Sequence, residues 1–226
     1  MSAEKVERTM DKDEQYWAAC REQGSPEWFE QRLGKVTASR MSDVMSKGVG
    51  RQRYMEQLIA ERLTGQLAES FSNAAMKWGT EQEPFARQAY EVERECLVGK
   101  THFWEDEEMD VGASPDGLID NNRDGYFQDG TYGLIEIKCP NSSTHLGWLA
   151  DKQVPSKHIK QIQCQLWITA AEWCDFVSYD PRIIDREKNM MIVRCERDEV
   201  LIKKMKEETI KFLDELDQLC KSLGEK

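Results

Sequence analysis

The sequence predicts an α/β protein in which helices flank a mixed central β-sheet. Helix signals lie near both ends of the chain, and strand signals are concentrated between them, which is typical of this class. The 226 residues are 39% hydrophobic, with seven Trp and seven Phe, so one sizeable core can form. Because no repeat or linker divides the chain, we expect a single domain over residues 1–226, with an N-terminal helical extension (1–24) and a C-terminal helix (197–226).

Helix signals dominate the first 95 residues. Ser25 is a good N-cap and Pro26 a good first helical residue, and Gly34 would end the short helix that they begin. Thr37 or Ser39 would cap the start of a second helix. Further helices are expected over 3–21, 54–65 and 73–95, with a Gly-rich basic loop over 48–53.

Strand signals follow, and then helix and strand alternate. We expect strands over 96–105, 108–117 and 134–139, with a polar turn at 121–133. A helix over about 156–171, strands over 174–180 and 190–196, and a charged helix over about 197–222 complete the chain. No apolar run approaches the roughly 18 residues that a membrane span needs, so no membrane partner is expected.

The cysteines indicate a reducing compartment. Seven cysteines are scattered without a CxxC pair, and the three His show no ligand spacing with them. We therefore expect reduced thiols in a cytoplasmic protein and no zinc or iron–sulfur site. The charged N-terminus does not resemble a secretory signal.

Charge is distributed unevenly along the chain. The net charge of −11 argues against a nucleic-acid partner, but residues 31–55 hold six basic residues against one acid, Asp43. Residues 105–120 hold seven acids and no base. A basic patch beside an acidic pocket suits a metal-dependent enzyme that acts on a polyanion. The alternative is ordinary surface charge in both stretches.

Asp116, Glu136 and Lys138 are the candidate chemical groups. Glu136 and Lys138 lie two residues apart on a predicted strand, so they point to the same face. If the strands around Asp116 and Glu136 pair as a hairpin, both carboxylates can bind one Mg²⁺, with the Ile137 carbonyl as a further ligand. Lys138 would orient a water or stabilise charge at a phosphate. The alternative is a buried Glu–Lys ion pair and an unrelated Asp turn.

Six motifs in consistent order carry a family resemblance over roughly residues 28–182. The chain resembles the PD-(D/E)xK nuclease superfamily and, within it, the YqaJ-type viral recombinases, the family of phage lambda exonuclease. The motifs are WFEQRLGKVTAS (28–39), WGTEQEPFAR (78–87), GASPDGL (112–118), IEIKCP (135–140), QIQCQLWIT (161–169) and YDPR (179–182).

The resemblance implies catalytic roles for the matched positions. Lys138 would be the catalytic lysine, and Glu83 would act on the metal or its water. Gln163, in preference to Gln161, would reach that water or the scissile phosphate, unless it is simply a polar residue on an amphipathic helix. The implied metal ligands are Asp116, Glu136, the Ile137 carbonyl and Asp106.

Four more residues match DNA-contacting positions. Arg32, Thr37 and Ser39 would bind the 5′-terminal phosphate, through a guanidinium fork, hydroxyls and helix-start amides. The two hydroxyls could instead only cap a helix. Met76 would be an apolar wedge that separates the strands, although a core Met is the alternative.

The function that the resemblance implies is a Mg²⁺-dependent 5′-to-3′ exonuclease that digests one strand of duplex DNA to mononucleotides. It would leave 3′ single strands for recombination by annealing, use two ions per site, and accept Mn²⁺. The resemblance also implies a homotrimeric ring, a single-strand annealing protein as partner, and a phage origin in the cytoplasm of a bacterial host. A PD-(D/E)xK endonuclease and a non-catalytic protein that binds DNA ends remain alternatives.

Overall fold

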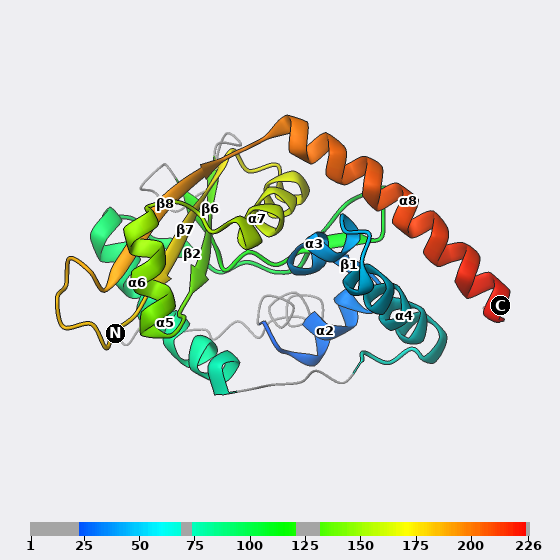
Figure 1. The fold of residues 1–226 in the computed structure, drawn as a ribbon, viewed down its shortest axis with the longest axis horizontal. Helices are drawn as coiled ribbons and strands as arrows, with labels where there is room; N and C mark the ends of the chain where they lie inside the picture. Colours follow the sequence, from blue (N-terminus) through cyan, green and yellow to red (C-terminus); the bar gives the residue numbers. More distant parts are fainter. Residues whose placement is uncertain (1–22, 69–73, 121–131, 225–226) are drawn as a thin grey trace, which may run out of the picture.

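The computed structural model describes residues 23–68, 74–120 and 132–224, and it confirms a mixed α/β fold (Figure 1). The helix expected over 3–21 and nearly all of the turn expected over 121–133 lie outside the described residues. Within them, five strands form one sheet in the order β2-β5-β6-β7-β8, and three form a second sheet in the order β1-β4-β3.

The strands expected over 134–139, 174–180 and 190–196 are confirmed closely, whereas the segments expected as single strands over 96–105 and 108–117 are interrupted and divided between the two sheets. The larger sheet contains β2 (Val98–Gly99), β5 (Gly117–Asp120), β6 (Tyr132–Lys138), β7 (Trp173–Tyr179) and β8 (Met190–Glu196). The smaller contains β1 (Val36–Thr37), β3 (Trp104–Glu105) and β4 (Val111–Ala113). Strand β6 pairs antiparallel with β5 and parallel with β7, so the sheet is mixed as predicted.

Helices surround the two sheets. They are α2 (Pro26–Arg32), α3 (Met41–Val44), α4 (Val49–Thr64), α5 (Ala74–Arg94), α6 (Ser142–Asp151), α7 (Ser156–Thr169) and α8 (Glu199–Leu223), with a 3₁₀ turn, η1, over Ala38–Arg40. None of the helices that the structure describes has the length and apolar character to cross a membrane.

Helix α7 lies between two hydrophobic cores. On one side, Ile162 and Leu166 pack against the face of the larger sheet that carries Leu134 and Phe176. On the other side, Trp167 joins the core built by α3, α4 and α8. Helix α5 covers the opposite face of the larger sheet. Figure 1 shows α7 between the sheet and the α3–α4 region, so this helix can connect residues from both.

Two helical segments also differ from the sequence prediction. Residues 48–53, expected as a Gly-rich loop, mostly form the first turn of α4. That turn is held from outside: the Arg51 guanidinium pairs with Glu215 of α8 at 2.6 Å and lies 5.0 Å from the centre of the Phe212 ring. Tertiary contacts thus override the local preference of two glycines. Helix α6 has no counterpart among the predicted elements.

Candidate active site

The β5–β6 hairpin brings Asp116 beside the strand that carries Glu136, as predicted. The Asp116 amide donates to the Ile135 carbonyl (3.1 Å), and the Asp116 carboxylate accepts from the Ile137 amide (2.6 Å). Gly117 is required on the other edge of β5, where β2 pairs, because a Cβ there would lie 2.3 Å from the Val98 side chain. A glycine directly after Asp116 therefore follows from packing.

Lys138 lies on the same face of β6 as Glu136, and the two side chains form an ion pair. The Lys138 ammonium also donates to the Ile137 carbonyl (3.2 Å). Burial alone would lower the pKa of Lys138, but the charges of Glu136 and Asp116 raise it above its ordinary value. Burial, and then the neighbouring Glu136 charge, raise the pKa of Asp116 well above its ordinary value. The buried Glu136 carboxylate thus lies beside the half-buried Asp116 and Lys138, where a bound cation would relieve the repulsion between the two carboxylates.

Helix α7 supplies two amide donors to Glu136. Gln161 donates to Oε1 at 2.6 Å and Gln165 donates to Oε2 at 2.7 Å. Residues four apart share one helix face, so both reach the same carboxylate. The i, i+4 spacing of these glutamines was the available signal for Gln165, which the sequence analysis did not select.

Gln163 does not reach the site, and the preference for it over Gln161 is wrong. Its amide nitrogen donates to the Glu196 carbonyl (2.7 Å), and its amide oxygen accepts from the Asp198 amide (2.8 Å). A residue two positions from Gln161 faces a different side of the helix. Gln163 instead ties α7 to the connection between β8 and α8.

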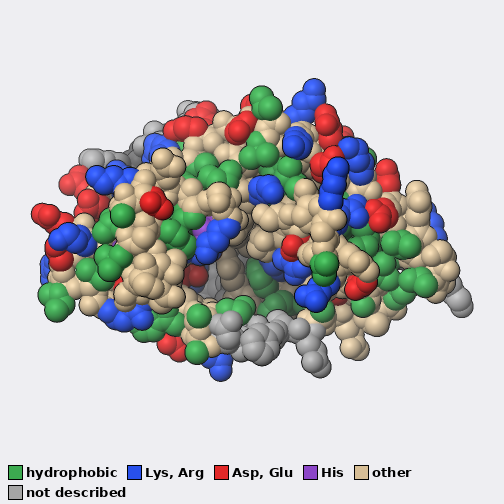
Figure 2. Space-filling view, in the orientation of Figure 1, with side chains coloured by type: hydrophobic (Ala, Val, Ile, Leu, Met, Phe, Trp, Pro, Cys, Tyr) green, Lys and Arg blue, Asp and Glu red, His purple; other side chains and the backbone are tan. Residues whose placement is uncertain are grey.

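One cavity of about 170 Å³ joins the predicted chemical residues to the predicted phosphate pocket. This face of the molecule is hollowed near its centre, and Lys and Arg side chains lie around the hollow (Figure 2). The residues that line the cavity come from α2 and the chain before it, from β1 and η1, from the β4–β5 connection, and from β6 and α7. They are Gln23, Trp28, Arg32, Thr37, Ala38, Ser39, Ser114, Asp116, Glu136, Lys138, Gln161 and Gln165.

Arg32 is a half-buried cation at one side of this cavity. Its guanidinium lies 4.0 Å from the centre of the Trp28 ring and donates to Ser114 Oγ at 3.5 Å. Burial lowers the pKa of Arg32 to about 10, so it remains charged at neutral pH. Within the part of the chain that the structure describes, no carboxylate forms an ion pair with it. A desolvated guanidinium held in this way can accept an anionic ligand.

Thr37 and Ser39 stand next to Arg32 in the same cavity. Their hydroxyl oxygens are 3.3 Å apart, and neither caps a helix, since Thr37 precedes η1 without a side-chain cap and α3 begins after Arg40. The Thr37 amide donates to the Tyr54 hydroxyl. Of the predicted phosphate ligands, the two hydroxyls are thus in place, whereas the Thr37 amide already has a partner.

Glu83 and Met76 lie on α5, outside the lining of this cavity. Burial raises the pKa of Glu83, with opposing effects from Arg87 and Lys138, so its carboxylate is close enough to interact with the site. Arg87 connects them directly, because it pairs with Glu83 (3.7 Å) and donates to the Asp116 carbonyl. Met76 is 53% exposed, which excludes the alternative of a core methionine.

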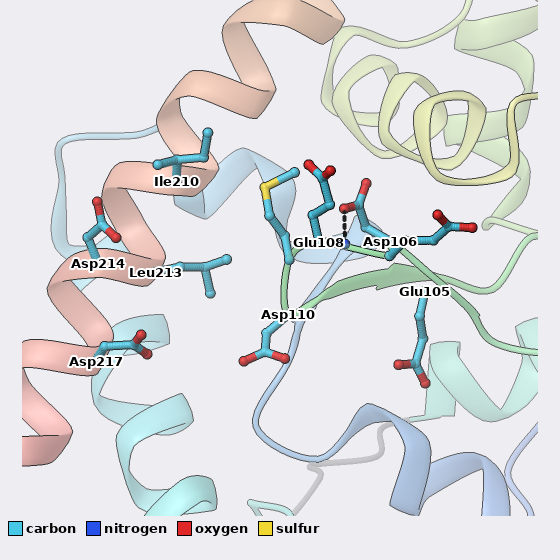
Figure 3. Close-up of a pocket in the computed structure, with 10 residues that line it drawn as sticks. Glu105, Asp106, Glu108, Asp110, Ile210, Leu213, Asp214 and Asp217 are labelled. Carbon is cyan, nitrogen blue, oxygen red and sulfur yellow. Dashed lines mark hydrogen bonds between the residues drawn. The ribbon is translucent and has the colours of Figure 1, made fainter.

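Asp106, a predicted metal ligand, lines a different cavity from Asp116 and Glu136, so the structure does not bring it together with them. Its carboxylate accepts from the Trp167 indole (3.1 Å) and from the Glu108 amide (3.1 Å). It lines a cavity of about 670 Å³ between the β3–β4 connection and α8, shown in Figure 3. The lining residues are Glu105, Asp106, Glu107, Glu108, Met109, Asp110, Ile210, Leu213, Asp214 and Asp217.

The donors around Asp116 suit Mg²⁺. The two carboxylates and the Ile137 carbonyl are hard oxygen ligands, and Mg²⁺ in proteins keeps several waters. Among the described residues, no three His, Cys, Asp or Glu side chains are grouped so that they could enclose a metal. A site with two carboxylates, one carbonyl and water is therefore the arrangement that these residues fit.

Comparisons with known proteins agree with the motifs. The YqaJ-like viral recombinase domain model matches residues 27–172. An alkaline exonuclease from Laribacter hongkongensis is 43% identical, with a TM-score of 0.79 over 88% of this chain and 96% of that one. The structure of LHK-Exo in complex with dAMP matches at 44% identity and a TM-score of 0.80, over the same shares of the two chains. A phage-related exonuclease from Haemophilus somnus 129PT, at 18% identity, TM-score 0.66 and coverage of 84% and 96%, shares the fold. No curated protein sequence matches.

Proposed function

The chain belongs to the YqaJ-like viral recombinase family, and from that premise we propose that it is a divalent-metal-dependent exonuclease. It digests one strand of duplex DNA from the 5′ end, releases mononucleotides and leaves 3′ single strands for recombination by annealing. The similar exonuclease whose structure contains dAMP, a deoxynucleoside monophosphate, supports release of mononucleotides.

The observation that carries the proposal is the shared cavity. Arg32, Thr37 and Ser39 offer a cation and two hydroxyls to a phosphate, while Asp116 and Lys138 lie in the lining of the same space. An enzyme that cuts inside a strand has no need of a separate site for a terminal phosphate. A terminal phosphate also carries more charge than an internal diester, so a half-buried guanidinium favours the end. These properties support an exonuclease over an endonuclease.

The polarity follows from what each cut leaves behind. Cleavage that releases a 5′ mononucleotide leaves a new 5′ phosphate on the remaining strand, which can enter the Arg32 pocket in turn. A 3′ end would present a hydroxyl, for which a half-buried cation offers little. The proposed direction is therefore 5′ to 3′.

The side chains around Asp116 have different proposed roles in the reaction. Asp116 and Glu136, with the Ile137 carbonyl, would hold Mg²⁺ or Mn²⁺. When bound, the ion polarises the scissile phosphate and makes a bound water more acidic. Lys138, which the neighbouring carboxylates keep protonated, stabilises negative charge that develops on the phosphate. Glu83, adjacent through Arg87, is placed to influence the same charges from α5.

The remaining parts of the proposal concern partners. We propose a homotrimeric ring that encloses DNA, a single-strand annealing protein as partner, and action in the cytoplasm of a bacterial host. The net charge of −11 supports enclosure, because an acidic chain gains little from bulk attraction to DNA and benefits from a topological link. Met76, exposed on α5, is the proposed wedge between the strands.

End-labelled linear duplex and closed circular duplex, each incubated with Mg²⁺ and with EDTA, test the function. We expect mononucleotides from the 5′ end of the linear substrate with Mg²⁺ only, and no product from the circle. Nicking of the circle would favour the endonuclease alternative. Binding to linear ends without cleavage under any divalent ion would favour the non-catalytic protein.

A further inference from the structure

Gln165 on α7 is an almost fully buried amide, 1% exposed, beside the candidate metal-binding carboxylate. Its nitrogen donates to Glu136 Oε2 at 2.7 Å. We propose that Gln165 is a positioning residue that holds the Glu136 carboxylate in the orientation needed to bind the ion. This inference rests on the proposed nuclease function and adds a residue to its machinery.

The two oxygens of Glu136 are held differently. Oε1 accepts from Gln161 (2.6 Å) and from Lys138, whereas Oε2 accepts from Gln165, its one side-chain donor among the described residues. The terminal torsion of a Glu side chain is broad and roughly two-fold. Contacts to Oε1 alone leave that torsion poorly restrained, and the contact from Gln165 fixes it. The plane of the carboxylate, and so the direction of its free lone pairs, depends on Gln165.

An amide suits this task because it is neutral. Glu136 already has one cationic neighbour, Lys138, and a second cation at Oε2 would compete with a metal ion for the same negative charge. The Gln165 amide satisfies one lone pair of a carboxylate that is 0% exposed, without cancelling that charge. The amide thus orients the carboxylate without introducing a second cation.

The other end of the same amide is left unsatisfied. Gln165 Oε1 is buried and has no hydrogen-bond partner among the described residues, whereas both amide atoms of Gln163 on the same helix have partners. An unpaired buried acceptor lowers stability. An apolar side chain of similar length would fill the position without that loss, so packing does not explain the amide. The hydrogen bond from its amide nitrogen to Glu136 does explain it.

The backbone that presents Gln165 is rigid. Its neighbours Cys164 and Leu166 are fully buried, in the two different cores that flank α7. Its carbonyl accepts from the Thr169 hydroxyl at 2.8 Å. A residue anchored in this way can hold the side chain of Glu136, which lies 29 residues earlier in the chain, in a fixed position.

Gln165→Met tests the role, with Gln163→Met as the matched control. Both replace a buried glutamine of α7 by an apolar side chain of similar length, but only the first removes a donor from Glu136. We measure Mg²⁺ and Mn²⁺ affinity of the full chain by calorimetry, and the thermal unfolding temperature. Removing a group that orients a metal-binding side chain typically weakens metal binding 10- to 100-fold. We expect a loss of about tenfold or more in Gln165→Met and little change in Gln163→Met.

Several outcomes separate the possibilities. Equal ion affinity in wild type and Gln165→Met overturns the inference, and so does an equal loss in both variants, which would reflect a general effect on α7. If Gln165→Met does not fold, Gln165→Asn keeps an amide in the pocket but is one methylene too short to reach Oε2, so the same loss is expected. If the wild type cleaves DNA with Mg²⁺ but the variants behave alike, the nuclease function stands and only the role of Gln165 fails. If the wild type neither binds a divalent ion nor cleaves, the proposed function fails as well.

Discussion

Two cavities among the described residues contrast in size and in the way that their carboxylates are held. The larger, about 670 Å³, is lined by seven carboxylates, while the smaller, about 170 Å³, contains two, Asp116 and Glu136. In the larger cavity the side chains of Asp110 and Asp217 are 58% and 50% exposed and both pair with Arg62. In the smaller one Glu136 is 0% exposed and receives three donors.

The difference indicates that the burial of carboxylates and their convergence on one point favour metal binding more than the number of carboxylates does. The carboxylates of the larger cavity are spread along a loop and a helix (Figure 3). Those of Asp110 and Asp217 are screened by water and already pair with Arg62. In the smaller cavity the pKa of Asp116 is raised first by desolvation and then by the charge of the neighbouring Glu136. Only in the smaller cavity does a divalent ion have a clear electrostatic reason to bind. The predictions below separate the two cavities experimentally.

The largest effect is expected from Lys138→Ala. The lysine acts mainly on charge in the transition state, and removing such a group typically lowers the rate by on the order of 10²–10³. DNA binding and the fold should persist. Single-turnover cleavage of a linear duplex measures the rate, with Lys211→Ala, an exposed residue of α8 that pairs with Glu208, as the control. Wild-type turnover in Lys138→Ala would remove the lysine from the mechanism.

Asp116→Ala and Glu136→Ala should each weaken Mg²⁺ binding by at least tenfold, and the double variant should lose little more. Residues that serve one ion act as a unit, so their effects are not additive. Calorimetry with Mg²⁺ on the two single variants and the double variant measures this. Unchanged affinity in both single variants would contradict the assignment of the smaller cavity as the metal site.

Arg32→Ala should slow digestion of 5′-phosphorylated ends about tenfold or more, and of 5′-hydroxyl ends less. Hydrogen bonds to charged groups contribute roughly 1.5–3 kcal/mol, which corresponds to this range. Arg32→Lys keeps the charge but loses the planar fork, so an intermediate rate is expected. The assay compares duplexes that differ only in the 5′ phosphate. Equal rates on both ends in wild type and variants would show that Arg32 binds no terminal phosphate.

The sequence predicted the fold class and the central hairpin because their signals are local. The alternation of apolar residues in β6 places Glu136 and Lys138 on one face, and the structure confirms the pairing of β5 with β6. The short helix that begins after Ser25 is also confirmed, with the Ser25 hydroxyl accepting from the Trp28 amide.

Two differences from the predicted site have one physical origin, which is that tertiary packing decides where an element faces. Helix α7 is buried on both sides, from Ile162 to Trp167, so apolar patterning could not show which glutamine meets Glu136. Asp106 and Asp116 are ten residues apart, but β4 and β5 belong to different sheets. Nothing in the three residues between those strands reveals that separation.

Asp106→Asn should have the smallest effect and tests the comparison most directly. The Asp106 carboxylate accepts from the Trp167 indole through Oδ2 and from the Glu108 amide through Oδ1, so asparagine, which has one oxygen, keeps one of these two bonds. With that oxygen toward Trp167, the substitution removes charge from the larger cavity and leaves the exposed Glu108 amide to water. We expect cleavage rate and Mg²⁺ affinity within about twofold of wild type, since a single surface-cavity charge is well screened.

Asp106→Ala removes the acceptor as well and leaves the indole of Trp167, which is 6% exposed, without its partner. That loss costs about 1–3 kcal/mol, so unfolding should shift to lower temperature while ion affinity is retained. The pair of variants separates a structural role of Asp106 from a metal-binding one. If Asp106→Asn weakened Mg²⁺ binding as much as Asp116→Ala, both cavities would contribute to one metal centre, and the distinction between them would be wrong.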